Sequence, residues 1–142
     1  MTIDIKTIKD DLDFVSNRIG EQTRTISIGV LAIAWLFLAG GKDAPAVKVM
    51  PDVFVLLSAG ALSIGSLLAD YFQYLCAYFV SLQVLNNTES NLDQTPEPEY
   101  NYQSFFHKSR RFFFWLKQIT CLFATGILIY AIVEALLESN PL

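Results

Sequence analysis

Residues 53–69 read VFVLLSAGALSIGSLLA, seventeen consecutive positions without a charged side chain. Asp70 interrupts the run, and residues 71–87 are again uncharged. A helix on the surface of a soluble domain must present polar side chains to water along one face. This stretch has no such face, and its length is close to that needed to cross a hydrocarbon core of about 30 Å. It therefore predicts a membrane-spanning helix.

Two further uncharged blocks, residues 26–39 and 118–133, repeat this pattern, and most of the charged side chains lie between the blocks. We therefore predict an all-α membrane protein, with three transmembrane helices in residues 26–137, and not a soluble enzyme. A secretory signal peptide does not fit the first block. Residues 1–25 carry a net charge of −1, with four cations and five carboxylates, whereas the region before a signal sequence is short and positive.

The N-terminal segment has an apolar heptad pattern. Its apolar side chains are spaced 3, 4, 3 and 4 residues apart, at Ile5, Ile8, Leu12, Val15 and Ile19. Residues 1–25 are thus predicted to form an amphipathic cytoplasmic helix, which enters the first span with no proline between them. Isoleucine at both core positions favours three or four strands. We interpret the five residues as oligomerisation contacts of a homo-oligomeric bundle, with a tetramer favoured. The alternative is a helix that lies on the membrane or packs on its own subunit.

The limits of the helices follow from glycine, proline and a cap. Gly40-Gly41 and Pro45 end the first helix, whereas Pro51 and Asp52 suit the start of the second. The second helix is predicted from Val53 to about Leu85, roughly 50 Å. It either projects into the cytoplasm or breaks near Asp70. Residues 86–111, with two prolines and an acidic and then a basic part, are predicted to be a cytoplasmic loop before a third span over residues 112–133.

Basic residues predict the orientation. They flank the first and third spans on one side, at Arg18, Arg24, Lys108, Arg110, Arg111 and Lys117, whereas the loop between the first two spans holds only Lys42 and Lys48. The positive-inside rule then places the N-terminus in the cytoplasm. The prediction is a multi-pass protein of a bacterial inner membrane, whose first partner is the lipid bilayer.

The polar residues of the second helix share one face. Ser63, Ser66, Asp70 and Gln73 are spaced 3, 4 and 3 residues apart. In an oligomer, such stripes can surround a wet axis, and rings of carboxylates select cations. We interpret these four residues as pore-lining. The alternative is tight helix packing, with the serine hydroxyls bonded to backbone carbonyls.

A basic and aromatic run precedes the third span, and its Lys108, Arg110 and Arg111 are candidate ligand-binding residues. Cations suit phosphates and aromatic faces suit bases, so one hypothesis is a nucleotide or oligonucleotide regulator. The alternative is a juxtamembrane anchor to anionic lipid. The net charge of −4 argues against a general nucleic-acid binder.

No catalytic constellation stands out. The sequence has one histidine, no H-E-x-x-H motif, and no C-x-x-C, since Cys76 and Cys121 lie apart in apolar blocks. We therefore expect no enzymatic activity, no catalytic residues, no metal site and no cofactor.

The organisation of residues 1–85 resembles that of small membrane effectors in bacterial anti-phage operons, including SLATT-type effectors and the membrane channel of the Hailong system. The resemblance rests on the helix Ile5–Ile19 leading into Ile26–Ala39, the turn Gly40–Asp52, and the long second helix with its polar stripe. A third span departs from the two-span SLATT pattern. The resemblance implies an oligomeric channel gated by a nucleotide-derived signal, whose opening depolarises an infected cell.

Two functions follow as hypotheses. The first is a gated, homo-oligomeric ion-conducting pore that acts as an effector in antiviral defence. The second is a non-conducting membrane subunit that anchors or scaffolds a cytoplasmic protein partner through residues 1–20 and 86–111.

Overall fold

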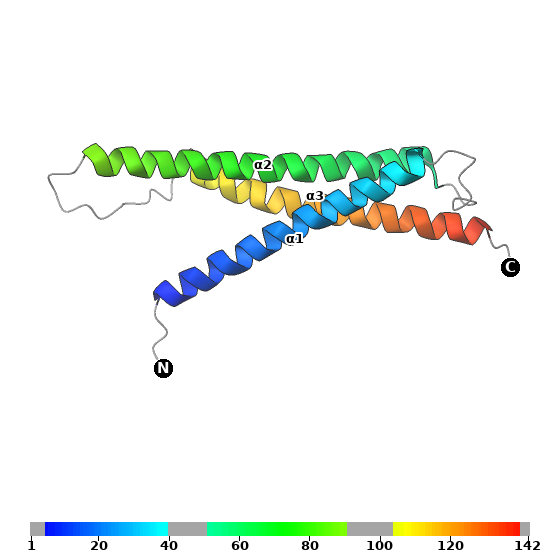
Figure 1. The fold of residues 1–142 in the computed structure, drawn as a ribbon, viewed down its shortest axis with the longest axis horizontal. Helices are drawn as coiled ribbons and strands as arrows, with labels where there is room; N and C mark the ends of the chain where they lie inside the picture. The colour runs from blue at the N-terminus through cyan, green and yellow to red at the C-terminus, as the bar shows by residue number, and fades with distance from the viewer. Residues whose placement is uncertain (1–4, 40–50, 91–103, 140–142) are drawn as a thin grey trace.

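The computed structural model describes residues 5–39, 51–90 and 104–139, which form three α-helices. They are α1 (Ile5–Ala39), α2 (Val53–Ser90) and α3 (Phe105–Ser139), and the described part of the chain contains no strand (Figure 1). Each contains a segment long and apolar enough to cross a membrane: Asp13–Ala39, Val53–Asn86 and Phe105–Glu138. The predictions of an all-α fold and of a multi-pass membrane protein are confirmed.

The α2 and α3 helices lie side by side and antiparallel, whereas α1 crosses them at an angle (Figure 1). The C-terminal half of α1 packs on the pair, and its N-terminal half diverges from it. The start of α1, the end of α2 and the start of α3 all lie toward one end of the molecule.

The start of α2 has the predicted cap. The Asp52 carboxylate accepts a 2.8 Å hydrogen bond from the backbone N–H of Phe54, which has no partner within the helix. From there α2 runs unbroken through Asp70 to Ser90, because neither proline nor glycine follows Gly65 within it. Its 38 residues extend about 57 Å, which is longer than a hydrocarbon core of about 30 Å, and the helix does not break at Asp70.

The predicted loop over residues 86–111 is too long. The α2 helix continues to Ser90, and α3 already begins at Phe105. The basic run of residues 107–111 is therefore helical, because it contains good helix formers and no proline or glycine.

The N-terminal segment is continuous with the first span, as predicted, since one helix covers Ile5–Ala39. Val15 and Ile19, the two heptad residues whose side chains the structure describes, are exposed on the diverging half of α1. The side chains of Ile5, Ile8 and Leu12 lie outside the described ones. Assembly through this face stays a prediction.

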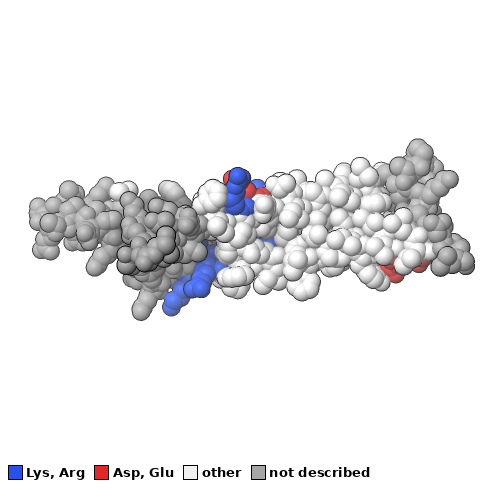
Figure 2. All heavy atoms as spheres, turned by 90° about the horizontal axis from the view of Figure 1, so that it is seen from below, with Lys and Arg blue, Asp and Glu red and all other residues white. Residues whose placement is uncertain are grey.

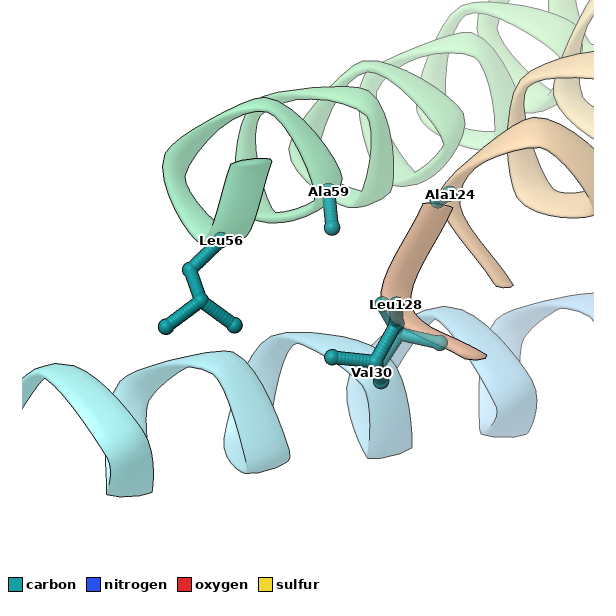
Figure 3. Close-up of a cluster of buried hydrophobic side chains, with 5 residues drawn as sticks. All are labelled: Val30, Leu56, Ala59, Ala124 and Leu128. Atoms are coloured by element: carbon teal, nitrogen blue, oxygen red, sulfur yellow. The ribbon is translucent and has the colours of Figure 1, made fainter. Parts of the chain in front are cut away.

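An apolar core holds the three helices together. It consists of side chains from α1, α2 and α3 that converge in Figure 3: Val30, Leu56, Ala59, Ala124 and Leu128. The two alanines let the backbones approach closely, which is how helices associate in lipid. The outward faces carry large exposed apolar side chains. Figure 2 shows a broad uncharged surface between charged groups toward the two ends, as expected for a surface in contact with hydrocarbon.

Candidate functional site

One charged side chain from each helix meets at a single point in the bundle. The Lys117 ammonium of α3 donates a 2.6 Å hydrogen bond to Oδ1 of Asp70 on α2. The Arg24 guanidinium of α1 donates to Oδ2 of the same carboxylate from Nη2 at 2.7 Å and from Nε at 3.0 Å. We call Arg24, Asp70 and Lys117 the Asp70 cluster.

Burial makes this pairing obligatory for two of the three residues. The side chains of Lys117 and Asp70 are only 2% and 9% exposed, whereas that of Arg24 is 41% exposed. A charged group in such a setting is costly unless it is paired and hydrogen-bonded. Two cations against one carboxylate leave a net charge of +1, which falls at the accessible edge of the cluster, on Arg24.

Aromatic rings complete the surroundings of both cations. The Arg24 guanidinium lies 5.5 Å from the centre of the Tyr74 ring and donates a 3.1 Å hydrogen bond to its hydroxyl. The Lys117 ammonium lies 5.6 Å from the centre of the Phe114 ring. Such cation–π contacts gain strength where water is excluded.

A glycine makes room for the buried lysine. A Cβ atom placed on Gly20 of α1 would lie 3.2 Å from Nζ of Lys117. A side chain at this position would therefore require the Lys117 ammonium to shift by a few tenths of an ångström.

A chain of hydroxyls ties the helices together one turn away. Ser27 of α1 donates a 3.0 Å hydrogen bond to Oγ of Ser66 on α2, and Ser66 donates a 2.8 Å bond to the carbonyl of Lys117 on α3. Both serines are buried. Ser63 is also buried, but it bonds within its own helix, to the carbonyl of Ala59 at 2.9 Å. The serine hydroxyls thus use their hydrogen-bonding capacity inside one chain.

The three residues of the Asp70 cluster lie at similar distances from the far ends of their apolar segments. Each residue of the cluster lies 15–17 residues, or about 23–26 Å, from the other end of the apolar segment of its helix. These ends are Ala39 for α1, Val53 for α2 and Glu134 for α3. Arg18 and Arg111 lie six residues farther out than Arg24 and Lys117, or about 9 Å. A hydrocarbon core of about 30 Å therefore ends between the cluster and these two arginines.

Beyond that boundary the helices continue as a projecting end, which we define as residues 5–18 of α1, 77–90 of α2 and 105–111 of α3. The α2 and α3 parts are joined by stacking of Phe79 on Phe106, with ring centres 5.1 Å apart. This end carries exposed aromatic side chains, although the helix lengths put it beyond the inferred edge of the hydrocarbon: Tyr78, Phe79, Phe105 and Phe106.

The structure brings three of the four predicted pore-lining residues to the interior of a single subunit. Ser63, Ser66 and Asp70 are buried between the helices, and Gln73 is partly buried. The hydroxyls and the carboxylate that the pore hypothesis exposes to water are instead bonded to α1, α3 or their own helix. This is the arrangement of the packing alternative, in which the stripe holds the subunit together.

The predicted ligand-binding residues are accessible. Lys108, Arg110 and Arg111 are exposed near the start of α3, and none of them forms an ion pair with a carboxylate of the described residues. Within residues 5–39, 51–90 and 104–139, no group of histidine, cysteine and carboxylate side chains is arranged to hold a metal ion.

Sequence reasoning did not identify the partners of Asp70. Arg24 and Lys117 were counted only as flanking charges that set the orientation. The contact could have been predicted from position, because Arg24 and Lys117 lie about as far from the far ends of their spans as Asp70 does from the far end of its own. Comparison with protein-family models, with curated proteins and with solved structures gives no match.

Proposed function

We propose that the chain is a non-conducting membrane subunit that anchors or scaffolds a cytoplasmic partner. One observation carries this proposal: Ser63, Ser66 and Asp70 of the polar stripe on α2 have hydrogen-bond partners within a single chain, whereas Oε1 of Gln73 has none among the described residues. Ser66 bonds to α1 and α3, and both oxygens of Asp70 are occupied by Lys117 and Arg24. A water-filled path along this stripe would require these bonds to break.

The projecting end supports the scaffolding part of the proposal. It extends α2 about 20 Å beyond the inferred edge of the hydrocarbon. Water-exposed helices normally carry polar outer faces, and a large exposed apolar patch marks an interaction surface. The exposed Tyr78, Phe79 and Phe105 form such a surface. A hollow of about 440 Å³ lies beside them, lined by Phe79, Leu82, Gln83, Asn86, Ser104, Phe105 and Phe106.

Ion flux through purified protein tests the absence of conduction. The protein is reconstituted into liposomes that contain a potassium-sensitive dye, with gramicidin as the positive control. We expect the same flux as in empty liposomes, both for the wild type and for Ser63→Ala, a stripe variant that should keep the fold because Ser63 bonds only within its own helix. A potassium flux that rises with protein content and changes in Ser63→Ala would overturn the proposal.

Site-specific photocrosslinking in cells tests the anchoring role. A photoreactive amino acid is placed at Phe105 or Tyr78 of the projecting end, and at Leu122, an exposed position of the span, as the matched control. We expect a discrete protein adduct from the first two positions and none from Leu122. Equal labelling at all three positions would argue against a dedicated partner surface.

The gated pore is a second candidate, favoured by a different observation. Val15 and Ile19 of the heptad are exposed on the diverging half of α1, which leaves a face for other copies of the chain. In a tetramer, the ion pairs of the Asp70 cluster would then stabilise the closed state of the pore. Such a channel predicts a tetramer in detergent and current only after a stimulus, whereas the anchor predicts no current under any condition.

A further inference from the structure

Two hollows follow the seam between α1 and α3, and Ile19 lines both of them. The outer one, which we call the head cleft, lies at the projecting end and also contacts α2 through Gln73. The inner one, which we call the tail groove, runs along the membrane-spanning part. We propose that this seam binds one anionic phospholipid, with its phosphate in the head cleft and an acyl chain in the tail groove. This inference does not rest on the proposed anchor function, but a pore assembled through Val15 and Ile19 would compete with the lipid, because both residues line the head cleft.

The head cleft has the chemistry of an anion site with an apolar floor. Its volume is about 560 Å³, and it is lined by Asp13, Val15, Ser16, Ile19, Gln73, His107, Arg110, Arg111 and Phe114. Arg110 and Arg111 form no ion pair with the described residues. Guanidinium groups suit phosphate because their planar donors can bond two oxygens at once. The carboxylate of Asp13 opposes an anion and sets a limit on affinity.

Gln73 also lines the head cleft, and its Oε1 is buried without a hydrogen-bond partner among the described residues. It lies about 5 Å deeper than Arg111 along the helices, whereas the terminal hydroxyls of a phosphatidylglycerol headgroup lie on the outer side of its phosphate. The preference for an anionic lipid therefore rests on the arginines.

The tail groove is mainly apolar, although its lining includes Gln118, whose Nε2 is buried without a hydrogen-bond partner among the described residues. Its volume is about 430 Å³, and it is lined by Ile19, Thr23, Ile26, Trp115, Gln118, Ile119, Cys121, Leu122 and Thr125. Thr23 and Thr125 both turn their hydroxyls to carbonyls of their own helices, so they present little polarity to a ligand. The groove therefore suits a hydrocarbon chain.

The two hollows follow one another in the order that a lipid requires. From Arg110 to Thr125 on α3 is 15 residues, about 23 Å. One leaflet offers about 15 Å of hydrocarbon plus the headgroup layer. The arginines lie outside the inferred hydrocarbon edge, and the tail groove lies inside it. A free nucleotide would fill the head cleft and leave the tail groove empty, so the presence of both hollows on either side of Ile19 favours a lipid.

Trp115 lines the tail groove and provides a direct probe of its occupancy. The only other tryptophan is Trp35, so Trp35→Phe leaves one reporter. This variant is reconstituted in phosphatidylcholine with increasing fractions of phosphatidylglycerol whose acyl chains are brominated, because bromine quenches tryptophan on contact. The reference titration uses brominated phosphatidylcholine in unbrominated phosphatidylcholine. We expect half-maximal quenching at a fraction of brominated phosphatidylglycerol about tenfold lower than that of brominated phosphatidylcholine.

Charge variants distinguish lipid binding in the seam from a general electrostatic attraction of the protein to an anionic membrane surface. Loss of a charge-assisted hydrogen bond predicts that Arg110→Gln or Arg111→Gln raises the required phosphatidylglycerol fraction by roughly tenfold. Asp13→Asn is expected to lower it, since a repulsive carboxylate is removed. Lys108→Gln is the matched control, because it removes one charge from the same end of α3 but does not line either hollow.

Three outcomes would overturn the proposal. The first is equal quenching by the two brominated lipids. The second is an effect of Lys108→Gln as large as that of the arginine variants, which would indicate diffuse electrostatics only. The third is that millimolar adenosine triphosphate abolishes the preferential quenching by brominated phosphatidylglycerol, and that the nucleotide also binds saturably to the protein in detergent. That result would assign the head cleft to a soluble phosphate compound.

Discussion

The ammonium of Lys117 lies 2.6 Å from the carboxylate of Asp70, and both side chains are shielded from solvent by the packing of three helices. The pair joins α2 to α3, and Arg24 adds α1 from the more accessible side of the carboxylate. The charges that interrupt the spans of α2 and α3 therefore neutralise each other. This explains how each helix tolerates a charge between its apolar segments.

Removing the carboxylate alone should destabilise the bundle strongly. In Asp70→Asn, Lys117 would keep its charge with no counter-ion, and breaking a buried pair typically costs about 3–5 kcal/mol. Arg24→Gln should cost about 1 kcal/mol or less, because the Arg24 side chain is 41% exposed and partly hydrated. Equilibrium unfolding in mixed detergent micelles, followed by circular dichroism, measures both.

A double variant tests whether the cost comes from the unpaired charge. Asp70→Leu with Lys117→Met replaces the pair by apolar side chains, which is often close to neutral for a buried ion pair. We expect it to recover most of the stability lost in Asp70→Asn. A double variant that is less stable than the single one would instead mean that the ion pair itself holds the helices together.

Gly20→Ala should destabilise the bundle, unlike the same substitution at Gly29 of the same helix. The Cβ of Gly20→Ala would meet Nζ of Lys117 at 3.2 Å, and the ammonium cannot move far because Asp70 holds it. We expect a loss of about 1 kcal/mol, as overpacking of a filled site costs about 1–3 kcal/mol and the gain in helix propensity offsets part of it. Gly29→Ala meets nothing within 4 Å, so it should gain about 0.5–1 kcal/mol. Unfolding measurements that rank the two variants in the opposite order would contradict this account of Gly20.

Replacing Ser66 or Ser63 of α2 with alanine should have different effects on stability, although both serines are buried. Ser66→Ala removes the hydroxyl that links Ser27 to the carbonyl of Lys117, so it breaks two contacts between helices. Hydrogen bonds between membrane helices average about 0.6 kcal/mol each, which predicts a loss of about 1 kcal/mol. Ser63→Ala breaks only a bond to its own helix and should be nearly neutral. Similar losses in both variants would show that the links between helices add nothing.

Local signals were enough to predict the helices. The uncharged blocks gave the three spans, and Pro51 with Asp52 gave the start of α2 because a cap depends only on neighbouring residues. The end of α2 and the start of α3 were misplaced because the helices were ended where the apolar side chains stop. The polar residues 86–90 and the basic residues 107–111 are helical nonetheless.

The stripe on α2 was recognised, but its partner could not be predicted from one sequence. A polar face at helical spacing is the same whether it meets water, other copies, or the other helices of its own chain. The choice depends on the relative heights of Arg24, Asp70 and Lys117, which the packing of three long helices sets. Gly20, which lies next to Lys117 in that packing, looks like any glycine in an amphipathic helix until the position of Lys117 is known.

The orientation in the membrane can be tested on the same molecule. The positive-inside rule predicts that the projecting end faces the cytoplasm and that the end of α3 faces outward. In a variant with Cys76→Ala and Cys121→Ala, single cysteines are introduced at Phe105 or at Leu137, two exposed positions near opposite ends of α3. A thiol reagent that cannot cross membranes should label Leu137→Cys in intact spheroplasts, whereas Phe105→Cys should react only after lysis. Labelling of Phe105→Cys before lysis would invert the orientation, and the projecting end could then no longer hold a cytoplasmic partner.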